Sequence, residues 1–596
     1  MPNPDFLKDL NPEQRKAVEY TGGPQLILAG AGSGKTRVLT YKAAYLISQE
    51  KYQPGQILMV TFTNKAAQEM KDRIKKLTAN LKLTNLPHAS TFHSLCAGIL
   101  RRHGHIIGLS PNFVIYDELD QKQAIKDIMT KLDLSTKLYY PGAVRAYISG
   151  AKNELLDAKT YGKIAHGKFQ EVVAQVYALY EKLLQKNQAV DFDDLLLFTV
   201  KLLTENSEIL NFYHRHFKYI LVDEYQDTNA AQYALTKLLV SRAHNLCVVG
   251  DASQSIYAWR GADYRNINRL KDDFPKLKVF NLEQNYRSTK NILQSANSVI
   301  SQNTKHPILK LWTKNPTGAK IILYEAKNEQ DEVIFITSRI EVLDLDYQDV
   351  AILYRTNAQS RVIEEIFLHR GLPYTLVGSV RFYERKEIKD LLSYLRLIAN
   401  PKDTISQTRV EKIGKNRTAR FYKFREEVGH LETLELLDGI LAATRYLDLY
   451  NKDNPEDQPR RENIKELRSV ASTFSDLYKF LENVALVESE YIPETPVNHQ
   501  NRVTLMTLHA AKGLEFKHVF IVGVEEGLFP HSRSLFDAEE MEEERRLCYV
   551  GMTRAKENLY LTYARRRLYF GQRLSNTVSR FVSEIPAELL DFSETV

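Results

Sequence analysis

A glycine-rich segment, AGAGSGKT at residues 29–36, could bind the phosphates of a nucleotide. It follows the apolar run LILAG and precedes RVLTYKAAYLI, and a phosphate loop needs this strand–loop–helix context. Glycines let backbone N–H groups turn toward phosphate oxygens, and the helix N-terminus adds a positive dipole end. The residues expected to surround the phosphates are Ala29, Gly30, Ala31, Gly32, Ser33, Gly34, Lys35 and Thr36. The strict consensus has glycine where Ala29 stands, so an ordinary glycine-rich turn is the alternative.

Two of these residues have distinct chemistry. Lys35 is expected to reach the β and γ phosphates, and the Thr36 hydroxyl to bind Mg²⁺. An acid pair after the apolar run YILV complements them: Asp223 suits a Mg²⁺ ligand, and Glu224 could polarise the attacking water as a general base. The alternative for this pair is a solvated acidic turn, which the upstream phosphate loop makes less attractive. A third apolar run, LCVVGD, leads to Gln254, which could sense the γ-phosphate.

Short apolar runs must position these side chains. They are LILAG (26–30), ILMVTFT (57–63), YILVDE (219–224), LCVVGD (246–251), IILYEA (321–326), VAILYR (350–355), VTLMTLH (503–509), HVFIVGV (518–524) and LYLTYA (559–564). Continuous runs of this kind are typical of parallel strands buried on both faces. Helical patterns at 65–77 and 284–300 lie between them, which predicts an α/β fold with two parallel-sheet cores flanked by helices.

Two mainly helical, polar regions interrupt the strand series and are interpreted as insertions. The expected domains are a first core at 1–105 and 195–280 with an insertion at 106–194, and a second core at 281–378 and 492–596 with an insertion at 379–491. The segment IPETPVNHQ, 492–500, is expected to be the linker that returns to the second core. A chain of 596 residues is long enough for several domains, because single cores stop growing at roughly 250–300 residues.

Composition excludes several classes of protein. The three cysteines are odd in number and far apart, so they offer neither a disulfide framework nor a metal site. No apolar run approaches the ~18 residues of a membrane helix, and the N-terminus lacks a signal-peptide pattern. We therefore expect a cytoplasmic protein. A net charge of +7 over this length permits a nucleic-acid partner without arguing strongly for one.

The motifs together resemble the UvrD/Rep/PcrA group of superfamily 1 DNA helicases, its PcrA-type members above all. The resemblance covers nearly the whole chain in order, through LNPEQRKAV (10–18), AGAGSGKT, TFTNKAAQEM (61–70), STFHSL (90–95), VDEYQDTN (222–229), GDASQSIYAWRGAD (250–263), LEQNYRS (282–288), FYERKEIKDLLSYLRLIANP (382–401), VTLMTLHAAKGLEF (503–516) and EEERRLCYVGMTRAKENL (542–559). It implies that the two cores are RecA-like P-loop NTPase domains with an ATP site between them, and that ATP and Mg²⁺ are the cofactors.

The resemblance also implies further roles at the ATP site. Gln14 would read adenine, which suits a carboxamide with one donor and one acceptor. Tyr286 and Arg37 would stack on the base, and Glu515 would meet the ribose. Arg287 and Arg554 would be arginine fingers, although spacing alone favours a surface position for either one.

Single-stranded DNA is held by backbone contacts and aromatic stacking. Phe62, Phe192, Tyr257 and Trp259 are the aromatic candidates, and Trp259 follows Gln254 by five residues, which could link nucleotide state to stacking. Phe62 and Phe192 adjoin apolar runs and could equally be core aromatics. By resemblance, phosphate and sugar contacts come from Thr63, Asn64, Thr91, His93, Arg260, Arg355, Asn357 and His509. His93 and His509 could also be structural histidines.

The resemblance implies a 3′–5′ helicase or translocase that acts on single-stranded DNA and on junctions with duplex, in repair or replication. The second insertion looks shorter than is usual for the family, which favours a second interpretation: a translocase that displaces proteins and unwinds poorly alone. An ATP-gated DNA-binding scaffold is a third. Unidentified repair or replication proteins are possible partners. Because the chain stops at Val596, soon after SRFVSEIP, without the extension by which many relatives bind RNA polymerase, we do not expect that contact.

Overall fold

The computed structural model describes residues 5–593, except residues 51, 82, 84, 137, 242, 430, 453, 455–456, 490–500 and 570–571. The chain divides into two compact units. Unit 1 contains Met1–Tyr286 and Lys305–Lys314, and unit 2 contains Arg287–Thr304 and Asn315–Val596. Residues 281–286 and 305–314 therefore pack with the first unit, whereas the sequence analysis assigned 281–378 to the second core.

Unit 1 is built on a six-stranded sheet in which every neighbouring pair is parallel. In spatial order its strands are β3 (His88–Thr91), β2 (Ile57–Thr61), β6 (Tyr219–Val222), β7 (Leu246–Gly250), β1 (Gln25–Ala29) and β8 (Lys278–Leu282). Because the strands are parallel, the loops that follow β6, β7 and β1 emerge from the same edge of the sheet. Those three loops contain the acid pair, Gln254 and the glycine-rich segment.

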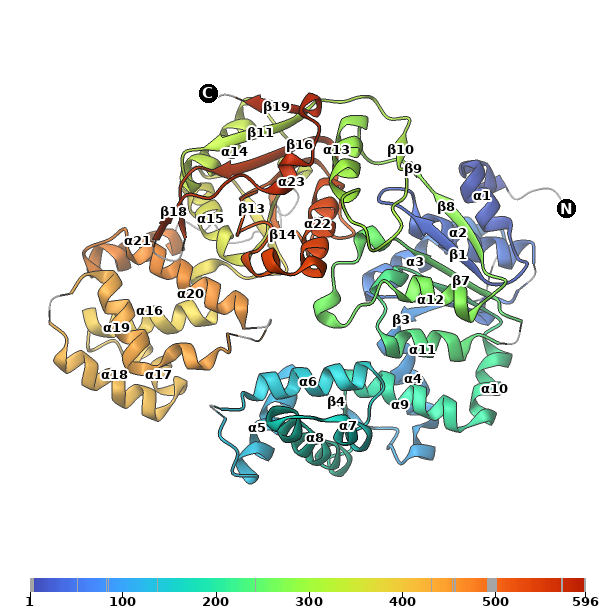
Figure 1. Cartoon of the computed structure of the whole chain (residues 1–596), viewed down its shortest axis with the longest axis horizontal. Coiled ribbons are helices and arrows are strands. Elements are labelled where there is room, and N and C mark those ends of the chain that lie inside the picture. Colours follow the sequence, from blue (N-terminus) through green and yellow to red (C-terminus); the bar gives the residue numbers. More distant parts are fainter. Residues whose placement is uncertain are drawn as a thin grey trace. The chain divides into compact units, whose positions relative to one another are not determined.

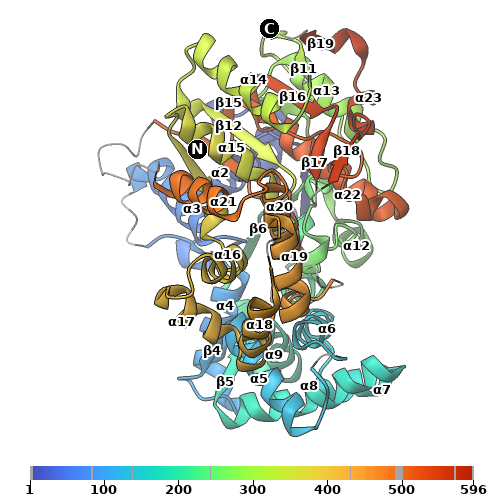
Figure 2. The same cartoon turned by 90° about the vertical axis from the view of Figure 1, so that its left-hand side faces the viewer.

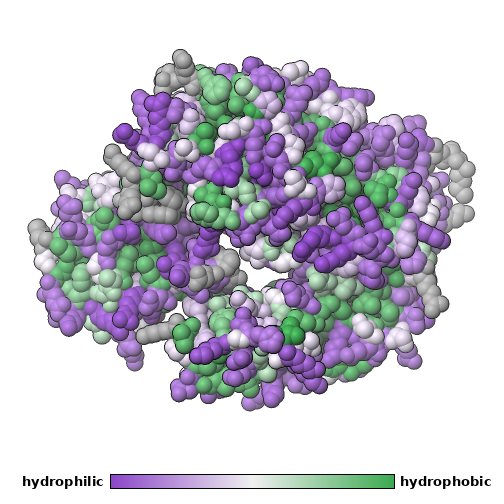
Figure 3. Space-filling view, viewed as in Figure 1, coloured by the Kyte–Doolittle hydropathy of each residue, from purple (hydrophilic) through white to green (hydrophobic). Residues whose placement is uncertain are grey.

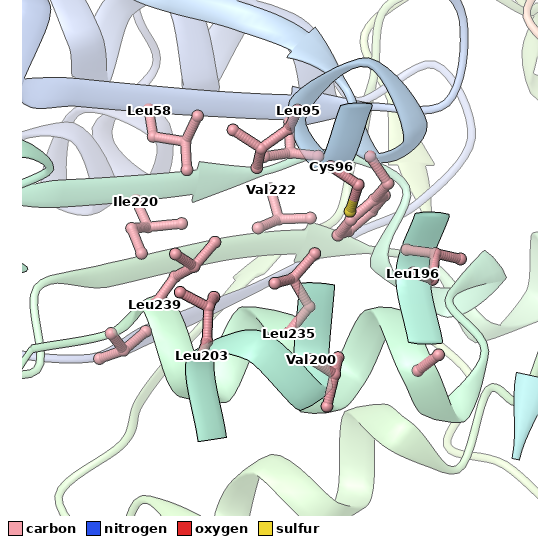
Figure 4. Packing of buried hydrophobic residues seen from close by; sticks show 14 of the residues in the cluster. Leu58, Leu95, Cys96, Leu196, Val200, Leu203, Ile220, Val222, Leu235 and Leu239 are labelled. Carbon is pink, nitrogen blue, oxygen red and sulfur yellow. The ribbon is translucent and has the colours of Figure 1, made fainter. Parts of the chain in front are cut away.

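Alternating side chains of these strands fill two separate layers of core. The flanking helices are α1 (Pro12–Glu19), α2 (Lys35–Ser48), α3 (Asn64–Leu77), α4 (Phe92–His103), α9 (Phe192–Glu205), α10 (Ser207–His216), α11 (Ala230–Leu239) and α12 (Asn266–Asp273). Leu58 and Ile220 face α4, α9 and α11, and Figure 4 shows the leucines of α9 and α11 turned toward them. Met59 and Leu221 face α1, α2 and α3. Each strand is therefore buried on both faces, as continuous apolar runs predict.

A helical insertion in unit 1 has its own core. It consists of α5 (Glu118–Lys131), α6 (Pro141–Asn153), α7 (Ala158–Ile164) and α8 (Lys168–Lys186), with the short parallel pair β4 (Val114–Tyr116) and β5 (Ala189–Asp191). Val173, Val176 and Tyr177 of α8 lie at the centre of this core. The four helices gather at one end of unit 1 in both views (Figures 1 and 2).

Unit 2 contains a seven-stranded parallel sheet. Its spatial order is β13 (Tyr374–Val377), β14 (Val503–Thr507), β12 (Val350–Tyr354), β15 (Phe516–Ile521), β16 (Ala555–Ala564), β11 (Ile321–Ala326) and β19 (Leu590–Ser593). Its helices are α13 (Lys290–Ile300), α14 (Glu329–Val342), α15 (Ser360–His369), α22 (Ala538–Met552) and α23 (Arg580–Ser583), and an antiparallel pair, β17 (Arg567–Tyr569) and β18 (Gln572–Leu574), follows β16. Ile336 of α14 and Phe367 of α15 pack on one face of this sheet.

The second insertion is an all-helical lobe with a separate core. It contains α16 (Lys386–Ala399), α17 (Thr404–Ile413), α18 (Lys415–Glu427), α19 (Thr433–Thr444), α20 (Gln458–Ala471) and α21 (Leu477–Ser489). Leu391 and Leu395 of α16 lie in this core with Phe421 and Leu467. This lobe is the yellow-to-orange group of helices in Figure 1.

All nine apolar runs are strands, which confirms the α/β fold and its parallel sheets. The helix expected at 65–77 is also confirmed, as α3. The helix expected at 284–300 is wrong in its first third, because Gln284–Asn285 is the short strand β9, paired with β10 (Trp312–Thr313), and the helix begins only at Lys290. The Asn285 side chain and the Tyr286 N–H donate to carbonyls of the glycine-rich loop, which ties this segment to the loop. The return linker expected at 492–500 lies outside the described residues.

The surface and the three cysteines can be described directly from the structure. Figure 3 shows hydrophilic residues spread across the visible face of both units, with smaller hydrophobic patches among them. Within the described ranges, no helix is long and apolar enough to cross a membrane. Cys96, Cys247 and Cys548 are all buried as free thiols. Burial raises the pKa of Cys96 to about 12 and that of Cys247 to about 11.

Candidate nucleotide and DNA sites

The backbone of the glycine-rich loop adopts conformations that only glycine accepts easily. Gly32 and Gly34 have φ values of +65° and +88°. A Cβ atom on Gly30 would lie 2.3 Å from Cδ2 of Leu311, so a side chain has no room there. Ala29, at the end of β1, is fully buried in the layer that faces α1 and α2, where a methyl group fits. The loop therefore keeps glycine where its turn requires it and tolerates alanine at its start.

The next chain segment holds this loop by its carbonyl groups. Asn285 Nδ2 donates to the carbonyl of Ala31 at 2.8 Å, and the Tyr286 N–H donates to Gly32 at 3.0 Å. These two bonds satisfy the carbonyls of two successive loop residues. They also explain why residues 284–286 do not continue the helix that begins at Lys290.

Lys35 and Thr36 open helix α2 directly after the loop. The Lys35 ammonium donates to the carbonyl of Ala29 at 3.3 Å, and the Thr36 hydroxyl donates to Asp223 Oδ2 at 3.1 Å. Burial and the neighbouring charge of Glu224 raise the pKa of Asp223 to about 7, against the opposing effect of Lys35. The structure thus brings together the lysine, the hydroxyl and the carboxylate that the sequence analysis assigned to phosphates and metal.

The donor set at this position fits Mg²⁺ only in company with a nucleotide. Within the described residues, no cluster of three or more His, Cys, Asp or Glu side chains could hold a metal ion. A hydroxyl and a carboxylate oxygen are hard ligands, and Mg²⁺ is commonly held by one or two carboxylates plus phosphates and water. Thr36 and Asp223 supply that minimal pair of oxygens.

Glu224 stands in a left-handed backbone conformation, with φ at +49°, immediately after the buried strand β6. Gln226 Nε2 donates to its carboxylate at 2.5 Å, and Gln226 Oε1 accepts from the Asp251 N–H at 2.9 Å. Gln254 Nε2 in turn donates to Asp251 Oδ2 at 2.6 Å. The loops after β6 and β7 are therefore one hydrogen-bonded network that contains both the expected base and the expected sensor.

Gln226 and Asp251 were not singled out from the sequence. Both are buried, and Asp251 has a pKa raised by burial although Lys35 opposes the shift. Their positions within VDEYQD and GDASQ, each directly after an apolar run, were the available signal.

Residues expected around the base lie beside the loop and already have partners. Gln14 is buried, its Nε2 donates to the Ser33 carbonyl at 2.9 Å, and its Oε1 accepts from the Asn11 N–H at 3.1 Å. Tyr286 is half exposed, and its hydroxyl accepts from Asn11 Nδ2 at 2.7 Å. Arg37 donates to the Asp9 carbonyl at 2.7 Å, and its guanidinium lies 5.3 Å from the Tyr41 ring. The Gln14 amide has a second N–H and a second oxygen lone pair beyond these two bonds, so it can keep both partners and still bind a base.

Unit 2 places three further expected residues in one cluster. Arg287 Nε donates to Glu515 at 2.7 Å, and Arg287 Nη1 donates to the Thr553 carbonyl at 3.0 Å. Arg554 is buried, with Nε 2.9 Å from the carbonyl of Val550. Burial alone would raise the pKa of Glu515, but hydrogen bonds and charges from Lys556 and Arg287 hold that pKa below its usual value. Arg287, Arg554 and Glu515 thus converge from segments far apart in sequence.

Several DNA candidates of unit 1 lie at or just after the ends of β2 and β3, which are neighbouring strands. The hydroxyls of Thr63 and Thr91 accept backbone N–H groups at the starts of α3 and α4, so both threonines are N-caps. Asn64 is the first residue of α3 and is exposed. Two capped helix N-termini at one sheet edge favour anions such as backbone phosphates.

The aromatic candidates differ in exposure. Phe62 is half-buried and packs 5.8 Å from the Phe92 ring, whereas Trp259 is 51 % exposed and Phe192 is 48 % exposed. The Arg260 guanidinium lies 4.5 Å from the Trp259 ring and 5.9 Å from that of Tyr257. The exposed rings are open to stacking partners.

His93 lies edge-on to Phe192, with ring centroids 5.8 Å apart. Burial lowers the pKa of His93, which favours the neutral imidazole. A neutral ring can donate one hydrogen bond and accept another, and it brings no charge to a phosphate.

The candidates of unit 2 follow β12 and β14, which also pair with each other. Arg355 and Asn357 come directly after β12, and His509 comes two residues after β14. Arg355 makes a bidentate contact with buried Glu544, at 2.7 Å from Nη2 and 3.0 Å from Nε. Burial is unfavourable for this guanidinium, but the charge of Glu544 raises its pKa above the usual value. The cation is thus fixed in one orientation at the sheet edge.

Comparison with known proteins gives two matching family models. The model described as the UvrD/REP helicase N-terminal domain matches residues 10–275, and that described as the UvrD-like helicase C-terminal domain matches residues 280–450 and 421–566. The ATP-dependent DNA helicase PcrA of Bacillus subtilis is 46 % identical over 648 residues, which cover 98 % of this chain and 87 % of that protein. The proteins of the same name from Staphylococcus aureus (strain Mu50) and Staphylococcus epidermidis (strain RP62A) are each 45 % identical over 643 residues, with the same coverage.

Proposed function

Because the chain belongs to the UvrD-like helicase family, whose domains are RecA-like P-loop folds, we propose that it is an ATP-dependent DNA helicase that moves 3′ to 5′ on single-stranded DNA. One observation carries the proposal. The loops after β1, β6 and β7 bring Lys35, Asp223, Glu224 and Gln254 to one edge of a sheet, and the last of these loops continues to the exposed Trp259. The loop after β7 therefore contains both Gln254, a candidate nucleotide contact, and Trp259, a candidate for base stacking. We place its work in DNA repair or replication.

At the nucleotide, Lys35 binds the β and γ phosphates, while Thr36 and Asp223 hold Mg²⁺. When bound, Mg²⁺ neutralises charge on the phosphate oxygens. Glu224 orients and deprotonates the attacking water, and Gln226 fixes the carboxylate that does so. Gln254 reads the presence of the γ-phosphate and passes it to Asp251 through their 2.6 Å hydrogen bond. The buried network between the two loops supports this assignment.

The remaining nucleotide contacts that we propose are those implied by the family resemblance. We assign adenine contacts to Gln14, Arg37 and Tyr286, and the ribose contact to Glu515. Arg287 and Arg554 stabilise charge on the γ-phosphate as it transfers, a role worth about 10³–10⁵ in rate where arginine fingers have been measured. Their shared cluster with Glu515 supports a common role.

For DNA, we assign base stacking to Trp259, Tyr257, Phe192 and Phe62. Contacts with phosphates and sugars come from Thr63, Asn64, Thr91, His93, Arg260, Arg355, Asn357 and His509. The helix N-termini at Thr63 and Thr91 and the exposed rings at Trp259 and Phe192 support this surface. The substrates we propose are single strands and the junctions where they meet duplex.

We also propose the four-domain organisation expected from the sequence, with the lobe α16–α21 as a shortened accessory domain. The aligned length of 648 exceeds the 596 residues of this chain, so the Bacillus subtilis relative has residues without a counterpart here. The C-terminal family model matches as two segments that overlap at 421–450, within this lobe. A reduced accessory domain favours a second candidate, a translocase that displaces proteins and unwinds poorly by itself.

Two assays test the proposal and separate the candidates. ATPase is measured with and without a dT oligonucleotide, and strand separation is measured on 3′-tailed and 5′-tailed duplexes. A helicase is expected to show stimulated turnover and to unwind only the 3′-tailed duplex. Stimulated turnover with displacement of streptavidin from biotinylated single strands, but without unwinding, supports the translocase. Absence of turnover leaves a DNA-binding scaffold and overturns the proposal.

For Trp259→Ala, we expect about tenfold weaker stimulation of the ATPase by dT oligonucleotides, because stacking is worth ~1–3 kcal/mol per base and 1.4 kcal/mol is a factor of ten. Basal turnover should stay within twofold, since the ring is exposed and is not part of the Gln226–Asp251 network. The measurement is the oligonucleotide concentration at half-maximal stimulation. Trp312→Ala is a matched control, because Trp312 is similarly exposed, at 46 %, and has no proposed DNA role. Unchanged stimulation in Trp259→Ala contradicts the stacking role.

A further inference from the structure

The C-terminal end of helix α6 forms salt bridges with the segment that contains Phe192. Lys152 Nζ lies 2.7 Å from Asp191 Oδ2 and 2.7 Å from Asp194 Oδ1, and all three side chains are buried. Asp191 and Asp194 also form the capping box at the start of α9. Phe192 stands between these two anchored carboxylates with its ring exposed. The position of α6 therefore sets the position of this ring.

The next residue of α6, Asn153, has contacts in two directions. Its Nδ2 donates to Asp193 Oδ1 at 3.2 Å, which is a third contact between α6 and the Phe192 segment, after the two salt bridges of Lys152. Its Oδ1 accepts a 2.6 Å hydrogen bond from Nδ2 of Asn229 in the α/β core. Asn229 is the N-cap of α11, and its Oδ1 accepts the Gln232 N–H at 2.9 Å. Because the cap uses the oxygen, the amide nitrogen is directed to Asn153.

Asn229 also ends the loop that begins with the acid pair. Between them lies a single 3₁₀ turn, Tyr225–Asp227, in which the Asp227 N–H bonds the Glu224 carbonyl at 2.9 Å. The carbonyl of Thr228 accepts both the Asp263 N–H at 3.0 Å and Asn266 Nδ2 at 2.9 Å. The loop that contains Trp259 is thus fastened to the residue before Asn229. A shift of the acid-pair loop would reach Trp259 and α6 together.

We propose that Asn153 is a positioning residue that couples the nucleotide loop 223–229 to the Phe192 contact with single-stranded DNA, through its hydrogen bond with Asn229. The inference rests on the proposed function, because it assigns DNA stacking to Phe192. Asn153 touches neither nucleotide nor DNA in this scheme. Its effect is to make the two exposed rings, Trp259 and Phe192, respond to the same loop.

The test is thermodynamic linkage, which a merely structural contact would not change. A non-hydrolysable ATP analogue alters the affinity for a fluorescent dT oligonucleotide by some factor, and the oligonucleotide must alter analogue affinity by the same factor. In Asn153→Ala, we expect this factor to move toward one by at least threefold. The affinity for dT without nucleotide and the basal ATPase rate should stay within twofold of the wild type.

Asn229→Asp provides an independent break of the same bond. Aspartate is as good an N-cap as asparagine, so α11 should be preserved while the donor to Asn153 is lost. We expect the same loss of linkage, and no further loss of linkage in the double variant, because both changes remove the Asn153–Asn229 hydrogen bond to which the coupling is assigned. Asn187→Ala is the control: Asn187 is an exposed asparagine of the same insertion whose Nδ2 donates to Tyr116 at 3.0 Å, away from this path.

The possible results distinguish failure of the coupling role of Asn153 from failure of the proposed helicase function. Wild-type linkage in Asn153→Ala, additive losses in the double variant, or equal loss in Asn187→Ala each overturn the role of Asn153 and leave the helicase proposal intact. A drop in dT affinity by the same factor with and without nucleotide also overturns it, since that is loss of binding without loss of coupling. Absence of any linkage and of any DNA-stimulated ATPase in the wild type would overturn the proposed function itself.

Discussion

Glu224→Gln is expected to bind ATP with nearly wild-type affinity while its turnover falls by about 10²–10⁴-fold, the range that general acid–base catalysis supplies. The substitution keeps the size of the side chain and an oxygen that can accept from Gln226, so the loop should stay in place. It removes the only feature that a base needs, a carboxylate able to take a proton. Asp223 and Lys35 remain, and with them the proposed contacts to metal and phosphates.

The measurement is a fluorescent-nucleotide titration beside steady-state ATPase at saturating dT oligonucleotide. Glu205→Gln, the same change at an exposed position at the end of α9, is the matched control and should behave as wild type. Full activity in Glu224→Gln would show that another group activates the water. Loss of nucleotide binding in this variant would instead move Glu224 from the base to the binding site.

Lys35→Ala is expected to weaken ATP binding by about 10- to 150-fold and to abolish turnover at cellular nucleotide concentrations. The range follows from the ~1.5–3 kcal/mol of a hydrogen bond to a charged group. A second effect adds to it. Lys35 is the cation that counters the raised pKa values of Asp223 and Asp251, so its loss leaves an acidic site facing an anionic ligand.

Nucleotide titration by fluorescence or calorimetry measures this loss, and circular dichroism confirms that the variant is folded. Lys76→Ala, at an exposed position in the last turn of α3, removes a positive charge elsewhere and is expected to be silent. If Lys35→Ala bound ATP as tightly as wild type, the glycine-rich loop would not be the phosphate site. Lys35→Ala tests nucleotide binding and Glu224→Gln tests the chemical step, so the two variants together separate these functions at one sheet edge.

The sequence predicted the framework of both sheets because buried parallel strands need continuous apolar side chains. Runs such as LILAG and LCVVG have that property, and each is a strand. The edge strand β3, with the sequence HAST, is short and polar, so nothing distinguished it from a loop. The segment 284–289 followed a helical pattern, but the Asn285 side chain and the Tyr286 N–H bond the carbonyls of Ala31 and Gly32, which lie about 250 residues away in sequence.

The arrangement of the candidate site was predictable where a polar side chain comes soon after a strand. Lys35, Asp223, Glu224 and Gln254 each stand at or just after a β-strand end, and the structure brings their loops together. Lys152 and Asn153 were not predictable, because in the sequence they are two polar residues at the end of an ordinary amphipathic helix. Their importance comes from Asp191, Asp194 and Asn229, which only the folded chain places beside them.

The burial of all three cysteines has a practical consequence for following the motor at work. Maleimide dyes react with thiolates, and thiols with pKa values near 11 and 12, or higher for Cys548, remain protonated and enclosed at neutral pH. Cysteines introduced at exposed positions should therefore take up dye selectively in the otherwise native chain. Single-molecule distance measurements on the two units could then proceed without first replacing Cys96, Cys247 or Cys548.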